Sequence, residues 1–140
     1  MRDWTFLAVL LFGLGGLSGC SWFGTKDTPK VNMSLLGYQT WSGADCKAFV
    51  SQDPLRCRTA DCRALLTGQK ARCQSGDCRA ILSMRAPQCE TDNCRAALRN
   101  RPAMCKTPEC LAHVTGRAEA CEAASCVAMI TGSINHCPDT

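Results

Sequence analysis

The sequence contains few of the large side chains that usually fill a protein core. Its 140 residues include 4 Phe, 3 Trp and 1 Tyr. A chain of this length has room for one modest domain. With so few large apolar residues, burial of a hydrophobic core cannot stabilise that domain alone. We therefore expect covalent staples to compensate for a thin core.

The chain also lacks the motifs of common catalytic and cofactor sites. There is no C-x-x-C, which excludes a thioredoxin-type redox site, and no C-x-x-C-H for haem attachment. No glycine-rich phosphate loop follows a strand, and no G-x-S-x-G nucleophile motif appears. The few carboxylates are concentrated at expected helix starts, where they suit the helix dipole. The sequence predicts no enzyme, no cofactor and no metal site.

Cysteine, in contrast, is abundant. Thirteen cysteines make up about 9% of the chain, a share typical of disulfide scaffolds in oxidising compartments. Twelve of them lie between residues 46 and 137, separated alternately by 11 and 5 positions. We predict that these twelve form disulfides: Cys46, Cys57, Cys62, Cys73, Cys78, Cys89, Cys94, Cys105, Cys110, Cys121, Cys126 and Cys137.

The cysteine spacing defines a unit of 16 residues that occurs six times. Hydroxyl side chains suited to helix N-caps stand three residues before four of the unit-opening cysteines, at Thr59, Ser75, Thr91 and Thr107. Residues suited to a left-handed helix stop follow nine positions after the cap position, at Gly68, Asn100, Gly116 and Gly132. Each unit therefore holds a helix of about two turns, which is too short to be stable alone.

These signals predict an all-α fold of short disulfide-stapled helical repeats stacked as a small solenoid. Packed at about 8–10 Å from one another, the units would form a rod or arc of about 50 Å. An alanine follows two positions after every unit-opening cysteine and allows close approach of neighbouring helices: Ala48, Ala64, Ala80, Ala96, Ala112 and Ala128.

Disulfide pairing within each unit, as in Cys62 with Cys73, is the preferred connectivity. Prolines after three of the helices, Pro54, Pro87 and Pro102, disfavour a continuous helix and favour a chain reversal, which brings the second cysteine back to the first turn. Pairing across the five-residue gaps, as in Cys57 with Cys62, would leave Cys46 and Cys137 without partners. The sequence alone does not prove either connectivity.

The N-terminus has the features of an export signal. An apolar run covers Trp4 to Leu17 and ends in Leu17-Ser18-Gly19-Cys20. This ending resembles the lipobox of bacterial lipoproteins. The resemblance covers the first 20 residues and implies cleavage before Cys20 and acylation of its sulfur, with palmitate among the expected chains. Because the other twelve cysteines belong to the repeat, the odd cysteine is the one that would carry lipid.

The resemblance divides the chain into a signal peptide (residues 1–19), a lipidated spacer (20–44) and a cysteine-rich repeat domain (45–140). Ser21, which is not an aspartate, follows the lipidated cysteine and favours the outer membrane, facing the periplasm. Within the spacer, apolar residues would cap the open end of the stack or, alternatively, bind a partner as a strand. These residues are Leu35, Leu36, Tyr38 and Trp41.

Basic and acidic residues are unevenly distributed along the repeat. Residues 45–106 carry 12 basic and 6 acidic side chains, whereas residues 107–140 carry 1 and 4. Four basic residues recur one period apart and predict a stripe for an anionic partner, unless Asp61 and Asp77 of adjacent units neutralise it. This stripe comprises Lys47, Arg63, Arg79 and Arg95.

The sequence therefore predicts an envelope lipoprotein whose repeat domain is a binding or structural module. Its expected partners are the membrane, through Cys20, and another envelope protein or an anionic surface, but not nucleic acid. One alternative is a metal-binding or redox-buffering periplasmic protein, although His113 and His136 are interpreted as repeat drift and not as ligands. Another alternative is a secreted toxin-like or inhibitory repeat protein without lipid.

Overall fold

The computed structural model describes residues 39–139. Within this range, six α-helices alternate with six short 3₁₀ helices, and no strand is present. The α-helices are α1 (Gly43–Ser51), α2 (Ala60–Thr67), α3 (Gly76–Ser83), α4 (Asp92–Arg99), α5 (Pro108–Thr115) and α6 (Ala124–Thr131). The 3₁₀ helices are η2 (Pro54–Arg56), η3 (Lys70–Arg72), η4 (Ala86–Gln88), η5 (Pro102–Met104), η6 (Ala118–Ala120) and η7 (Ile134–His136).

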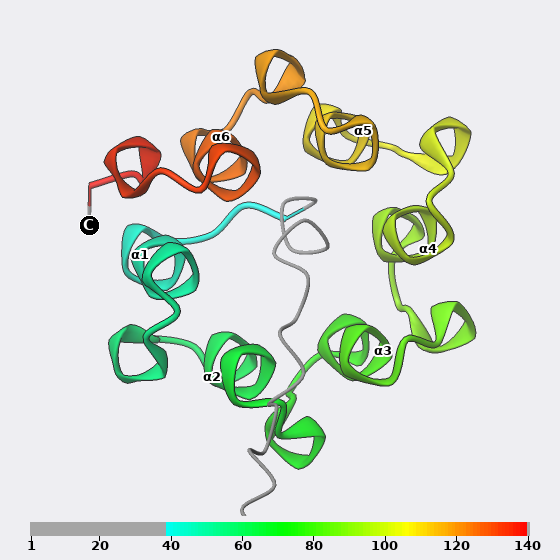
Figure 1. Ribbon diagram of the computed structural model, residues 1–140. Coiled ribbons are helices and arrows are strands. Elements are labelled where there is room, and N and C mark those ends of the chain that lie inside the picture. The colour runs from blue at the N-terminus through cyan, green and yellow to red at the C-terminus, as the bar shows by residue number, and fades with distance from the viewer. Residues whose placement is uncertain (1–38, 140) are drawn as a thin grey trace, which may run out of the picture.

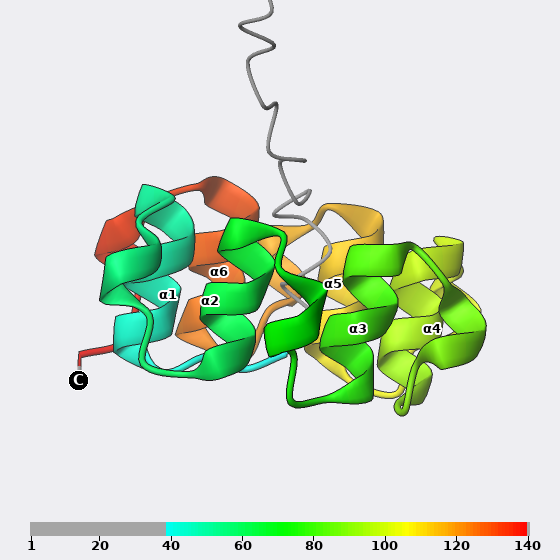
Figure 2. The same cartoon turned by 90° about the horizontal axis from the view of Figure 1, so that it is seen from below.

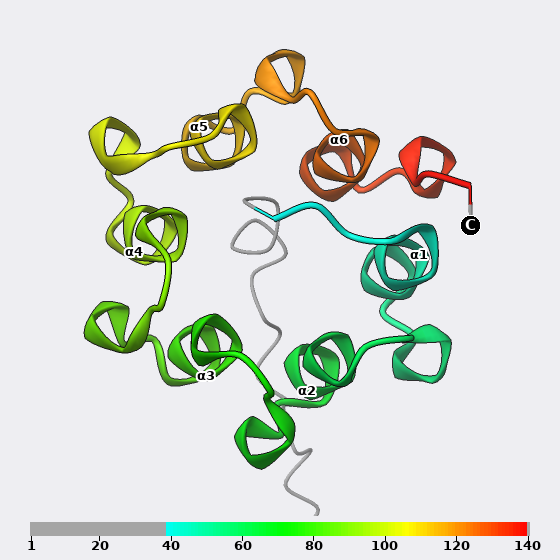
Figure 3. The same cartoon turned by 180° about the vertical axis from the view of Figure 1, so that it is seen from behind.

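The α-helices stand side by side and close into a ring, in which α6 packs against α1 (Figure 1). The 3₁₀ helices lie outside the ring and return the chain to the start of the next α-helix (Figures 1 and 3). All six α-helices therefore run in the same direction (Figure 2). The predicted all-α class of disulfide-stapled helical repeats is confirmed. The predicted open rod or arc is wrong, because the last unit meets the first.

The predicted helix starts are confirmed. The hydroxyl oxygens of Thr59 and Ser75 accept hydrogen bonds from the N–H groups of Cys62 and Cys78, at 3.2 and 3.1 Å. Thr91 and Thr107 cap α4 and α5 in the same way. Each cap satisfies a backbone donor that the first helical turn leaves without an intrahelical partner. The helices therefore begin at equivalent positions in successive units.

The predicted helix stops are confirmed at Asn100 and at the three glycines, all of which have positive φ angles. Gln52 and Met84 also adopt this left-handed conformation, with φ of 55° and 53°. These two stops were not predicted, because glutamine and methionine rarely take positive φ. All six α-helices thus end with the same backbone turn, whatever the side chain.

Small residues make up much of the core. All six repeat alanines are fully buried, and the unit-opening cysteines are fully or almost fully buried. Larger side chains contribute at only a few positions, including Phe49 and Leu65. In the second unit, Cys62 and Leu65 are buried on one helical face, and the half-buried Leu66 packs beside them. The core is therefore thin, as expected, and the disulfides lie within it.

Candidate functional site

All twelve cysteines of the repeat form disulfides. Five bridges join cysteines five positions apart, between the end of one unit and the helix of the next. The sixth joins Cys46 to Cys137 across 91 positions. The five short bridges are Cys57–Cys62, Cys73–Cys78, Cys89–Cys94, Cys105–Cys110 and Cys121–Cys126.

The predicted pairing within units is therefore wrong. Cys73 bonds to Cys78 of the next unit and not to Cys62. The prediction rejected this pattern because it would leave Cys46 and Cys137 unpaired. In a closed ring these two cysteines are neighbours, with Cα atoms 5.7 Å apart, and they bond to each other. Each disulfide consequently fastens two units together.

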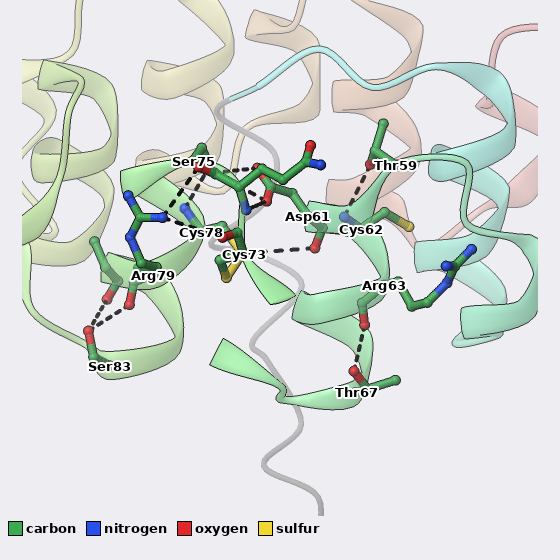
Figure 4. The surroundings of a disulfide bond; sticks show 12 residues. Thr59, Asp61, Cys62, Arg63, Thr67, Cys73, Ser75, Cys78, Arg79 and Ser83 are labelled. Carbon is green, nitrogen blue, oxygen red and sulfur yellow. Dashed lines mark hydrogen bonds between the residues drawn. A yellow bond between two sulfur atoms is a disulfide. The ribbon is translucent and has the colours of Figure 1, made fainter. Parts of the chain in front are cut away.

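A side-chain oxygen beside each short bridge strengthens the contact between units, which we call a joint. At the joint between α2 and α3, Oδ1 of Asp61 accepts hydrogen bonds from the N–H groups of Gln74 and Ser75, at 2.6 and 3.3 Å (Figure 4). Asp77 accepts from Glu90 and Thr91 in the same way. These backbone groups precede the next helix and would otherwise lack an intrahelical acceptor.

The position of this acceptor is preserved around the ring, but its chemistry varies. Asp45 accepts the N–H of Arg58 at 2.6 Å, whereas Asn93 and Glu109 fill the equivalent positions in the fourth and fifth units. Acidic residues in the first turn thus do more than complement the helix dipole. They bind the backbone of the following unit, a role that the sequence pattern did not predict.

The carboxylates and disulfides form three clusters that resemble metal-binding triads in composition. In each, an aspartate oxygen and two sulfur atoms lie within 4.8 Å of one another. Both sulfur atoms belong to a disulfide and offer no thiolate. The aspartate also accepts backbone hydrogen bonds. The clusters are Asp45/Cys57/Cys62, Asp61/Cys73/Cys78 and Asp77/Cys89/Cys94.

The contact between α6 and α1, which we call the seam, differs from the joints. Ser125 stands where the joints have a carboxylate or, at Asn93, an amide, and its Oγ accepts the N–H of Trp41 at 3.2 Å. The Trp41 ring packs edge-to-face on Phe49, with ring centroids 4.7 Å apart. Gly43 lies so close to the backbone of Pro138 that a Cβ would collide with it. The seam therefore requires a small residue at position 43.

The sequence predicts that Trp41, together with Leu35, Leu36 and Tyr38, caps an open end or forms a partner-binding strand. The ring has no open end among the described residues, and Trp41 packs at the seam. Leu35, Leu36 and Tyr38 lie outside the described residues, as does Cys20.

The predicted basic stripe occupies the position after the unit-opening cysteine in the first four units, and we call it the outer basic row (Lys47, Arg63, Arg79 and Arg95). Its arginines donate to backbone carbonyls of the preceding linker, as in Arg63 to Cys57 at 3.2 Å and Arg95 to Cys89 at 2.7 Å. The suggestion that Asp61 and Asp77 neutralise this row is wrong. Arg79 pairs instead with Glu90, at 3.8 Å, and Arg95 with Asp92, at 2.6 Å.

A second set of arginines stands where the α-helices end, and the sequence interpretation missed it. Arg85, Arg101 and Arg117 each follow the left-handed residue of their unit, and Arg99 lies in the last turn of α4. All four are exposed. We call this set the arginine rim. Its signal in the sequence was the recurrence of Arg85, Arg101 and Arg117 one period apart.

Of the two histidines, His113 is buried and His136 is exposed. Burial lowers the pKa of His113 to about 4, because desolvation disfavours its charged form. Its Nδ1 has no hydrogen-bond partner. His113 occupies the position of Phe49 and Leu65 in their units, so its environment is that of a core residue.

Comparisons of this chain with protein-family models, with curated proteins and with solved structures found no match. Within residues 39–139, no helix is long and apolar enough to span a membrane.

Proposed function

We propose that this chain is an envelope lipoprotein whose disulfide-bonded ring acts as a binding or structural module. The observation that carries the proposal is the complete pairing of the repeat cysteines. Six disulfides use all twelve of them, so no cysteine of the chain is left to pair with Cys20. The odd cysteine is also the residue that ends the lipobox-like sequence, where acylation would use its sulfur.

The ring supports a role in binding or structure more than one in catalysis. The carboxylates of Asp61 and Asp77 are engaged by backbone N–H groups of the next unit. A hollow of about 470 Å³ lies at the helix starts. Its lining includes three acidic side chains, Asp61, Asp77 and Glu90. Glu90 is paired with Arg79. The groups that could act as acids or bases there are thus employed in holding units together.

The proposed anchor is tested with Cys20→Ala in the native host. We expect the wild-type chain to fractionate with membranes and to incorporate labelled palmitate, and the variant to do neither. Ser21→Ala is the matched control, which should keep both properties. Retention of the variant in membranes, or an unlabelled wild-type chain, would refute the anchor. Ser21→Asp should move the protein from the outer to the inner membrane if the lipoprotein resemblance also governs sorting.

A second candidate function rests on the three Asp/Cys/Cys clusters, which would offer thiolate and carboxylate ligands if their disulfides were reduced. A thiol count under denaturing conditions separates the two candidates. The ring proposal predicts no free thiol in the exported protein. Several titratable thiols, with one zinc ion bound per reduced cluster, would favour the metal-binding or redox-buffering alternative.

A further inference from the structure

The arginine rim occupies one end of three consecutive units. The N–H groups of its three periodic arginines donate to helix carbonyls five positions earlier, at 2.8–3.0 Å, which fixes each arginine at the same level of its unit. Since α3, α4 and α5 are neighbours that run in the same direction (Figure 2), the four side chains start from one end of the ring. With helices about 8–10 Å apart, they span roughly 20 Å.

The charges of the rim are available to a partner. Among residues 39–139, none of the four arginines forms an ion pair, and none donates a side-chain hydrogen bond. The outer basic row is different, because the guanidinium groups of Arg63, Arg79 and Arg95 are engaged by backbone carbonyls. Of the two basic sets, only the rim therefore presents guanidinium groups without partners in the described chain.

An apolar side chain stands beside these charges. Met84 directly precedes Arg85 and is 65% exposed. It also adopts a left-handed backbone conformation, which three other units assign to glycine and one to asparagine. Methionine gains nothing locally from this position, because it disfavours positive φ and leaves its thioether in water. The residue choice is understandable if the side chain enters an apolar medium when the rim is occupied.

We propose that the arginine rim, together with Met84, docks the ring onto the anionic phospholipid head groups of a bilayer. Guanidinium groups bind phosphate oxygens bidentately. Equivalent turns of parallel helices present these groups at one level, which suits a planar array of phosphates. Met84 would reach the apolar boundary below the head groups. This inference rests on the proposed function only in placing the protein at a membrane.

The length of the spacer is compatible with this orientation. The described chain enters the ring at the helix starts, on the end opposite the rim (Figure 2). The 19 steps from Cys20 to Gln39 can span at most about 65 Å. An eight-residue helix is about 12 Å long, so a lipid on Cys20 could sit beside either end of the ring. The surface chemistry is then what selects the end that faces the membrane.

Helix dipoles give another reason for arginines at helix ends, since cations are favourable there. This explanation predicts an effect on stability but none on lipid binding. The two explanations therefore differ in what they predict for a binding measurement and for a melting curve.

The experiment measures vesicle binding by the full chain carrying Cys20→Ala, so that the anchor plays no part. Binding is compared on phosphatidylcholine vesicles with and without phosphatidylglycerol, because the apolar N-terminal segment could bind both. We expect an increase on anionic vesicles that falls as salt is raised. Replacing all four rim arginines by glutamine should reduce this increase by roughly tenfold or more.

The matched control replaces the outer basic row by glutamine (Lys47, Arg63, Arg79 and Arg95), which removes the same charge. This variant should keep most of the anionic preference. An equal loss in both variants would mean that net charge alone is responsible and would overturn the proposal. So would an absence of anionic preference in the starting protein, or its abolition by millimolar inorganic phosphate, which would indicate a site for free phosphate.

Met84→Asn places in the third unit the residue that the fourth unit has at Asn100. We expect it to weaken binding to anionic vesicles while leaving the melting temperature unchanged or higher. Unchanged vesicle binding would remove Met84 from the docking surface. Membrane release of Cys20→Ala in cells tests the anchor alone, so failure of the anchor and failure of the rim give different results.

Discussion

The five joints and the seam all hold neighbouring units together, but they do so with different interactions. A joint uses a disulfide between cysteines five positions apart and a side-chain acceptor for the next unit's backbone. The seam uses a disulfide across 91 positions, the hydroxyl of Ser125 and a glycine against Pro138. Joints therefore depend on neighbours in the sequence, whereas the seam depends on the whole ring having formed.

One residue explains part of this difference. Pro138 stands at the position of Arg58 in the first unit, just after the last cysteine of its unit, but proline has no N–H to donate. The acceptor at Ser125 is occupied instead by the N–H of Trp41, which comes from the other end of the described chain. At the seam, the terminal linker therefore lacks one hydrogen-bond donor, and the N–H of Trp41 takes its place.

The largest expected effect comes from removing the seam disulfide. In the chain-entropy model, a loop of 5 residues contributes about 2 kcal/mol and a loop of 91 about 4.5 kcal/mol. Cys46→Ala/Cys137→Ala should therefore lower the free energy of unfolding by about twice as much as Cys89→Ala/Cys94→Ala. Denaturant unfolding of both double variants measures this, and neither leaves a free thiol. Equal losses would show that the seam is no different from a joint.

Acid should weaken one regular unit and leave the seam disulfide intact. The pKa of His113 is lowered to about 4 in the folded chain, compared with 6.5 for an ordinary histidine. Between these values the unfolded chain binds more protons, so stability is complete above about pH 6.5 and falls as the pH decreases to about 4. The loss from this group approaches about 3 kcal/mol.

The matched variant for this test is His113→Leu, which copies Leu65 of the second unit. It should remove the part of the pH dependence between pH 4 and 6.5, as measured by denaturant unfolding at several pH values. A profile that His113→Leu leaves unchanged would assign the acid sensitivity to other groups. The same pH profile in Cys46→Ala/Cys137→Ala would show that unit and seam contribute independently.

The packing around two glycines differs between the seam and a joint. A Cβ on Gly43 would collide with the backbone of Pro138, whereas one on Gly76 would meet the side chain of Glu90. Backbone cannot move aside as a flexible glutamate can. Gly43→Ala should therefore destabilise the protein by about 1–3 kcal/mol, and Gly76→Ala should be close to neutral. Thermal unfolding measures both, and a tolerated alanine at position 43 would contradict the close approach at the seam.

The sequence was sufficient for the local structure. Thr59 and Gly68 predicted where α2 begins and ends, because capping and positive φ are properties of a few residues. Met84 was missed for the same reason, since its stop is imposed by the repeat and not by its own preference. The acceptor role of Asp61 was also missed, because it joins groups 13 positions apart that only folding brings together.

The disulfide pairing was predicted wrongly for a different reason. Pairing within units was preferred because an array of units was taken to have two free ends, at which Cys46 and Cys137 would lack partners. Two cysteines without partners, one at each end of the array, were themselves evidence for a closed ring in which the two ends meet. Residue spacing records which groups are near in sequence, but closure depends on the angle between successive units, and no residue pattern in this chain expresses that angle.

The smallest expected effects concern the polar acceptors. Asp77→Asn keeps the side-chain oxygen that Asn93 uses in the next unit but removes its charge, and hydrogen bonds to charged groups exceed neutral ones by about 1 kcal/mol. Ser125→Ala removes a single neutral bond to Trp41, worth about 0.5–1 kcal/mol. Both losses are measured by denaturant unfolding. If Ser125→Ala were more costly than Asp77→Asn, the seam would depend more on the hydrogen bond to Trp41 than a joint depends on the charge of its acceptor.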